Sequence, residues 1–109
     1  MNINFPNDEN GDVLRGMVDE GDDISKPRNI DFYFAFEIED EAKCFAEQVR
    51  VTTGLPAEVS TYESDQWQVC VTKYMVPKHH DITELETSLT HIARLYHGDA
   101  DGWGSMKQD

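Results

Sequence analysis

The chain has 109 residues, of which 39% are hydrophobic and 28% are charged. This length supports one hydrophobic core, and the composition is that of a globular domain rather than a disordered chain. The 22 acidic residues outnumber the nine lysines and arginines, so the formal net charge is −13. A surface of this kind repels nucleic-acid phosphates and attracts a basic partner, although solubility alone would also explain it.

Export and membrane insertion are not indicated. The apolar runs are far shorter than the roughly 20 residues of a membrane-spanning helix. The first six residues lack the basic and apolar regions of a secretory signal. Cys44 and Cys70 are too few for a disulfide framework or a four-ligand zinc site. We therefore expect a single domain over residues 1–109 that works in the reducing cytoplasm.

The first predicted element is a helix that begins after Asn7 or Asp8, either of which can cap it, and stops at Gly21. Two internal glycines weaken this helix by about 1 kcal/mol each relative to alanine, so it needs tertiary support. Its apolar residues recur at helical spacing: Val13, Leu14, Met17 and Val18. A loop up to Pro27 then leads into an extended segment.

A strand and a helix follow. Apolar side chains alternate over Ile30–Ile38, which predicts a strand whose even-numbered residues face the core. Glu39 then opens a helix that Gly54 terminates. One stripe of this helix is apolar: Ala42, Phe45, Ala46 and Val49.

The second half of the chain predicts a hairpin, a helix and a last strand. The runs 56–63 and 67–76 read as strands, and the turn 64–66 between them favours antiparallel pairing. A helix capped at Asp81 runs to about Tyr96, and a short strand is expected near Trp103. The inward side of this helix is predicted to carry Ile82, Leu85, Leu89, Ile92 and Leu95.

These elements predict an α+β fold. Without the leading helix the order is β-α-β-β-α-β, the split arrangement called ferredoxin-like. We expect a ferredoxin-like α/β sandwich with an extra N-terminal helix, in which two helices cover one face of an antiparallel sheet.

The histidines are weak candidates for a metal site. His79, His80 and Asp81 are adjacent, and Glu84 follows one turn later. Adjacent histidines in a strand-to-helix turn point apart, and neither this spacing nor that of His91 and His97 matches a known ligand pair. We expect an ordinary polar surface, with no metal and no cofactor.

No catalytic site is predicted either. Cys44 and Cys70 stand in no C-x-x-C pair and beside no cation at a helix start, the settings that activate a thiol. Pairs of carboxylates are frequent in the sequence only because acidic residues are numerous, so they do not indicate acid–base catalysis. Motifs for a nucleophilic serine, a phosphate loop or a metalloprotease are absent from the sequence. The chain is therefore expected not to be an enzyme.

The sequence leaves open what covers the second face of the sheet, the face opposite the two helices. The predicted register places on it Tyr33, Ala35, Tyr62, Cys70 and Tyr74. Tyrosines on a four-stranded sheet are typical of RNA-recognition modules, but the basic residues that accompany them there are missing. We expect the N-terminal helix to cover this face, with a protein partner and nucleic acid as alternatives.

Several stretches together resemble one known family. They are Phe5-Pro6-Asn7-Asp8-Glu9-Asn10-Gly11-Asp12-Val13-Leu14, Gly21-Asp22-Asp23, Lys26-Pro27-Arg28 with Ile30-Asp31-Phe32, Met75-Val76-Pro77, and Asp101-Gly102-Trp103-Gly104. Over nearly its whole length the chain resembles the regulators of ribonuclease E activity, type B. The resemblance implies a ferredoxin-like fold with an added N-terminal helix.

The resemblance also implies a function, that of a non-enzymatic bacterial inhibitor that binds ribonuclease E and modulates RNA turnover. An acidic protein suits this task because it competes with RNA phosphates for the arginines of the nuclease. The best-known members carry a long acidic C-terminal tail, whereas the sequence here stops soon after Trp103 with residues 105–109. It resembles a short relative whose target or strength of inhibition differs.

The leading hypothesis is a binder of a basic ribonuclease segment. Seven acids among the first 25 residues face only Arg15, a local net charge of −6. The candidate partner-binding residues are Asp8, Glu9, Asp12, Asp19, Glu20, Asp22, Asp23, Tyr33, Tyr62, Tyr74 and Trp103. Packing at the sheet edge is an alternative role for Trp103. The rival hypotheses are a small-molecule or metal-binding domain, and a homodimer formed through the second face of the sheet, which carries the tyrosines.

Overall fold

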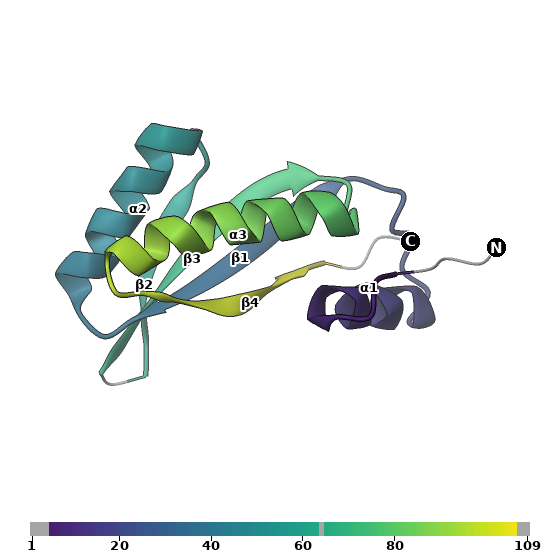
Figure 1. The fold of residues 1–109 in the computed structure, drawn as a ribbon, viewed down its shortest axis with the longest axis horizontal. Helices are drawn as coiled ribbons and strands as arrows, with labels where there is room; N and C mark the ends of the chain where they lie inside the picture. Colours follow the sequence, from purple (N-terminus) through teal and green to yellow (C-terminus); the bar gives the residue numbers. More distant parts are fainter. Residues whose placement is uncertain (1–4, 64, 107–109) are drawn as a thin grey trace.

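The computed structural model describes residues 5–63 and 65–106, apart from the side chain of Tyr62. This part of the chain forms three helices and four strands (Figure 1). Their bounds are Glu9–Asp19 for α1, Arg28–Phe36 for β1, Glu39–Thr53 for α2, Ala57–Tyr62 for β2, Gln66–Met75 for β3, His79–Leu95 for α3 and Asp99–Ser105 for β4. The predicted α+β class and element order are confirmed.

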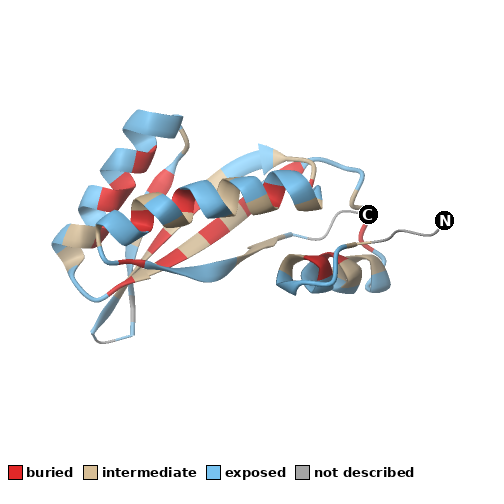
Figure 2. Ribbon diagram, in the orientation of Figure 1, coloured by how far each residue is buried: buried red, intermediate tan, exposed pale blue. Residues whose placement is uncertain are grey.

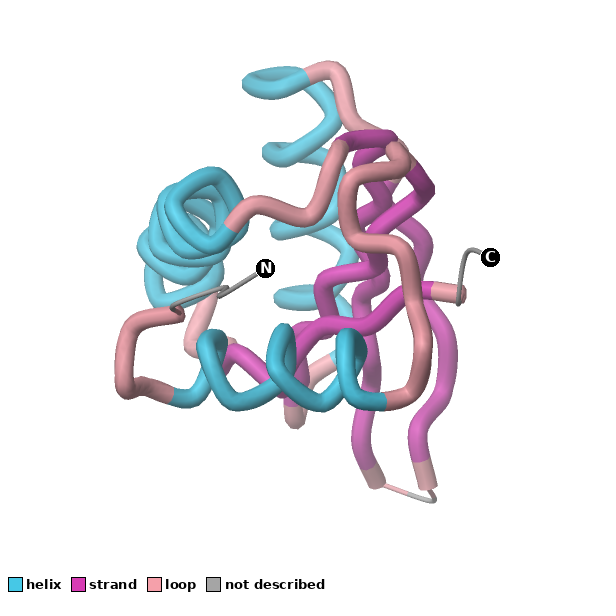
Figure 3. Tube along the Cα trace, turned by 90° about the vertical axis from the view of Figure 1, so that its right-hand side faces the viewer, coloured by secondary structure: helices cyan, strands magenta, loops and turns pink. Residues whose placement is uncertain are grey.

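The four strands form one antiparallel sheet in the order β2-β3-β1-β4. Helix α2 connects β1 to β2, and β3 lies between these two strands in the sheet. Helix α3 connects β3 to β4, and β1 lies between those two strands. Each β-α-β unit is therefore split by a strand of the other unit. Both helices pack on the same side of the sheet, as Figure 3 shows.

The core lies between the sheet and these two helices. In β1 the even-numbered side chains from Ile30 to Phe36 are at most 2% exposed, as their alternation predicts. The stripe of α2 meets them: the Phe45 ring lies 5.1 Å from Phe34 and 5.2 Å from Phe36. Figure 2 shows buried positions alternating with half-buried ones along β1. Burial of these large rings is favourable because it removes apolar surface from water.

Particular residues explain where the helices begin and end. The Asp8 side chain accepts a hydrogen bond from the backbone N–H of Gly11 at 2.7 Å and so caps α1. A side chain at Gly11 would collide with the carbonyl oxygen of Pro6. This glycine is therefore needed for the close approach of Pro6 to the start of α1, and does more than weaken the helix. Gly54 ends α2 with a φ of 73°, as predicted.

Two element boundaries and the orientation of one residue differ from the sequence prediction. Helix α3 begins at His79, so Asp81 lies in its first turn rather than at its cap, which is Lys78. Strand β1 ends at Phe36, and Ile38, predicted to face the core, precedes α2 and is 55% exposed. Leu95 is 73% exposed because it lies two residues, about 200° of helical rotation, beyond the buried Ala93.

Helix α1 does not cover the second face of the sheet, so this prediction is wrong. It packs against α3 at one end of the molecule (Figure 1). Only Gly11 and Leu14 of α1 are buried. Polar contacts to α3 and β4 hold the helix on the same side of the sheet as the other two helices (Figure 3).

Candidate functional site

Six of the seven predicted N-terminal acids lie at the surface. We call this group the acidic segment: Asp8, Glu9, Asp12, Asp19, Glu20 and Asp23. Asp12 forms an ion pair with Arg15. Asp8 faces α3, where His79 Nε2 lies 3.0 Å from both carboxylate oxygens. The hydrogen bond from the Gly11 N–H, and next that with His79, lowers the pKa of Asp8, so its carboxylate stays charged.

Asp22 does not belong to that surface, and its prediction as a contact residue is wrong. Its carboxylate forms an ion pair with Arg28 at 2.7 Å, and the two side chains are only 4% and 1% exposed. Arg28 also donates to the backbone oxygens of Asp23 at 2.8 Å and Lys26 at 3.2 Å. The pair therefore fixes the loop between α1 and β1. The sequence gives no local signal for this pair, because Asp22 lies in the loop whereas Arg28, six residues later, is the first residue of β1.

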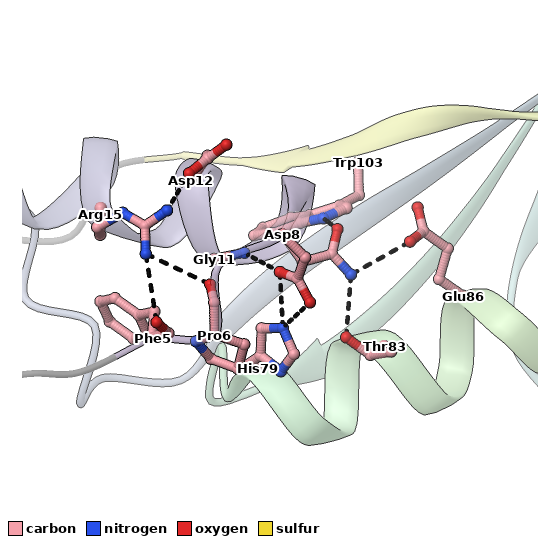
Figure 4. A network of polar contacts seen from close by, with 11 residues as sticks. Phe5, Pro6, Asp8, Gly11, Asp12, Arg15, His79, Thr83, Glu86 and Trp103 are labelled. Carbon is pink, nitrogen blue, oxygen red and sulfur yellow. Dashed lines mark hydrogen bonds and ion pairs between the residues drawn. The ribbon is translucent and has the colours of Figure 1, made fainter.

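The side chain of Asn10 joins α1 to α3 and β4 through hydrogen bonds. Figure 4 labels its three partners, Thr83, Glu86 and Trp103. Its side-chain nitrogen donates to Thr83 Oγ1 at 3.0 Å and to Glu86 Oε1 at 3.3 Å. Its side-chain oxygen accepts a hydrogen bond from Trp103 Nε1 at 2.9 Å. One amide thus connects three elements, and the chain pattern gives no local signal for it.

Trp103 has a structural position in this network. It is half-buried, packs against the core, and lies opposite Phe32 in the register of β1 with β4. The register of β4 shifts next to it, and Gly102 takes a φ of 91° at this irregularity. This geometry agrees with the packing role considered for Trp103 from the sequence.

The second face of the sheet is uncovered by any described helix, and we call it the open face. Its residues alternate with the buried ones along the strands: Asn29, Asp31, Tyr33 and Ala35 of β1, Gln66, Gln68, Cys70, Thr72 and Tyr74 of β3, Glu58 and Ser60 of β2, and Asp99 of β4. All of them are half-buried or exposed. Thr72 Oγ1 donates to Asp31 Oδ1 at 2.6 Å and fixes that carboxylate.

The tyrosines of the open face are spread out. Tyr33 lies opposite Cys70, whereas Tyr74 lies four residues, about 13 Å, further along β3 and is 66% exposed. Tyr62 lies opposite Gln66 at the other end of the hairpin, but its side chain is outside the described residues, as is Ser64 of the turn. The structure therefore shows no continuous stack of rings over the described part of the face.

The chemistry of the open face does not favour a nucleophile. Burial raises the pKa of the Cys70 thiol, so it stays protonated near neutral pH. Burial, and next the charge of Asp31, raises the pKa of Tyr33. Cys44 is exposed on α2 and does not belong to the buried stripe of that helix. These groups suit packing and binding better than covalent chemistry.

Three of the four histidines each form an ion pair with a single carboxylate. His80 Nε2 lies 3.2 Å from Glu84 Oε2, and His97 Nδ1 contacts Glu41 Oε2. His91 lines a shallow hollow of about 360 Å³ between α1, α3 and β4. Among the described residues no three His, Cys, Asp or Glu side chains are placed to hold a metal ion. In the same part of the chain no helix is long and apolar enough to cross a membrane.

Comparison with known proteins gives a match to a family model over nearly the whole chain. A family model described as "Regulator of ribonuclease activity B" matches residues 7–105. No curated protein sequence matches the chain. The fold is weakly similar to the crystal structure of a C-terminal segment of the alpha subunit of aIF2 from Pyrococcus abyssi, with a TM-score of 0.37 and 11% identity. That similarity covers 91% of this chain and 61% of the other.

Proposed function

The chain belongs to the regulator of ribonuclease activity B family, and we propose that it is a cytoplasmic, non-enzymatic protein that binds and inhibits an endoribonuclease of the ribonuclease E type. The family match over residues 7–105 carries this proposal. The described fold accounts for the same range, from the cap of α1 to the end of β4.

The charge of the protein supports a basic binding site on the nuclease. The net charge is −13, and the acidic segment gathers exposed carboxylates around α1. Arginines that bind RNA phosphates also bind carboxylates through paired hydrogen bonds, so an acidic protein competes with RNA for them. Its long-range field also speeds the encounter with such a partner.

Inhibition requires no chemistry from the chain itself. The thiol of Cys70 is held protonated, and the described histidines in ion pairs each face a single carboxylate. Neither arrangement supplies a nucleophile oriented by a base, which acyl or phosphoryl transfer by a side chain would need. Occupying the substrate-binding region of the nuclease is sufficient.

A cleavage assay tests this function. Purified ribonuclease E is given a short fluorescent RNA with increasing amounts of the protein. We expect cleavage to slow in proportion to the complex formed, and the inhibition to weaken as salt rises because exposed charges are screened. The double variant Asp19→Asn/Glu20→Gln should slow association while leaving the fold intact. Unchanged cleavage at saturating protein would refute the proposal, as would cleavage of RNA by the protein alone.

A further inference from the structure

The open face carries charge of one sign. The strand register places three charged residues on it, and all three are carboxylates: Asp31, Glu58 and Asp99. The one lysine of β3, Lys73, lies opposite Ile30 and so points to the helix side. Between the acids lie groups that form hydrogen bonds, among them Gln66 and Gln68. The face is therefore polar, aromatic and negative.

One end of the open face is hollowed. The hollow has a volume of about 260 Å³ and is lined by Ala35, Phe36, Glu37, Gln66, His97 and Asp99. Three of these residues belong to the open face itself. The ion pair of His97 is made with Glu41. No ion pair within the described part of the chain occupies the carboxylates of Glu37 and Asp99.

The chemistry of this surface selects among possible occupants. RNA would bring phosphates against Asp31, Glu58 and Asp99, and a second copy of the chain would bring the same three carboxylates against them, so both pay a repulsive cost. A guanidinium group suits the site because it pairs with carboxylates through a planar fork of donors and stacks on an aromatic ring such as Tyr33. Charge complementarity thus favours a basic polypeptide, and one rich in arginine rather than lysine.

We propose that the open face binds an arginine-rich segment of a protein partner, with one arginine side chain seated in the hollow beside Glu37 and Asp99. The identity of the partner rests on the proposed function: the segment belongs to the ribonuclease that the protein inhibits. The acidic segment around α1 then attracts the partner from a distance, while the open face makes the contacts.

The test uses the full chain and three probes: ribonuclease E, an oligoarginine peptide and an oligolysine peptide of equal length. Binding is followed by fluorescence anisotropy for the wild type and for the double variant Glu37→Gln/Asp99→Asn. The matched control is Asp81→Asn/Glu84→Gln, which removes the same charge from exposed positions on α3, on the helix side. Circular dichroism confirms that both variants remain folded.

We expect the open-face variant to weaken binding of oligoarginine and of ribonuclease E about tenfold, and the α3 variant to weaken it about twofold at most. Oligolysine should bind more weakly than oligoarginine and discriminate less between the variants. Equal losses for the two variants would overturn the proposal, because only total charge would then matter. Ribonuclease binding that is unaffected by the open-face variant would also overturn it, yet would leave the proposed inhibition standing.

Three further outcomes separate this proposal from its alternatives. If ribonuclease E does not bind at all, the proposed function fails, and the oligoarginine arm alone decides whether the face takes a basic segment. Single-stranded RNA that binds the wild type and loses affinity in Tyr33→Ser would overturn the proposal in favour of a nucleic-acid surface. A dimer seen by light scattering and abolished by Tyr33→Ser would overturn it in favour of self-association.

Discussion

The two faces of the single sheet differ in almost every physical respect. The helix side holds Phe32, Phe34 and Phe36, all at most 2% exposed, with α2 and α3 packed over them. The open face holds Tyr33 and Ala35 between them in the same strand, half-buried and without a helix above. One strand therefore carries the core on its even residues and a solvated surface on its odd ones.

Because of this difference, residues on the open face can be substituted, or can bind a partner, without loss of the fold. Removing a core side chain leaves a cavity, whereas changing a solvated one costs little. A partner seated on the open face meets side chains that the fold does not need. The predictions below test this division, from the largest expected effect to the smallest.

The largest loss of stability is expected for Phe45→Ala. Its ring is fully buried and contacts the rings of both Phe34 and Phe36. Its removal should lower the free energy of unfolding by about 3–5 kcal/mol, measured by urea denaturation. Tyr33→Ala on the open face is the control and should cost no more than about 1 kcal/mol. Losses of equal size would mean that both faces of the sheet support the fold.

Two neighbouring carboxylates give a sharper version of the comparison. Asp22→Asn leaves the buried Arg28 without its ionic partner and should cost about 3 kcal/mol in the free energy of unfolding. Asp23→Asn, one residue away and exposed, should cost much less. Thermal and urea unfolding measure both. If the two variants lose the same stability, the ion pair contributes nothing beyond the surface charge.

The smallest effect is a pH dependence at the end of the open face. The hydrogen bond with Glu41 raises the pKa of His97 above its ordinary 6.5. Its stabilisation is therefore complete below about pH 6.5 and lost as the pH rises through the raised pKa. His97→Asn should reduce stability at about pH 5.5 and have little effect at about pH 9. An effect that is the same at both pH values would mean that the charge of His97 plays no part.

The sequence alone predicts those parts of the fold that follow a local period. The alternation from Ile30 to Phe36 identifies β1 and its inward face, because each side chain simply takes the next side of the strand. Gly54 marks the end of α2, because a left-handed residue there needs no side chain. The exposed acids around α1 were also predictable from their clustering.

The remaining features depend on contacts that no local pattern records. Asn10 reaches Thr83 and Trp103, which lie 73 and 93 residues away in the sequence. These contacts place α1 on α3 rather than on the open face. Clustering in the sequence places Asp22 with the surface acids, because its burial against Arg28 depends on how the loop folds. Charge and exposure are thus separable only once the tertiary structure is known.

The central claim, that a basic partner binds the open face, is tested most directly by nuclear magnetic resonance of the labelled protein. The side-chain amide groups of Gln66 and Gln68 report on this face, and the amide group of Asn10 reports on the far end near α1. On addition of oligoarginine, and then of ribonuclease E, the account predicts shifts of both glutamine signals with the Asn10 signal nearly unchanged. Shifts confined to Asn10 and the acidic segment would contradict it.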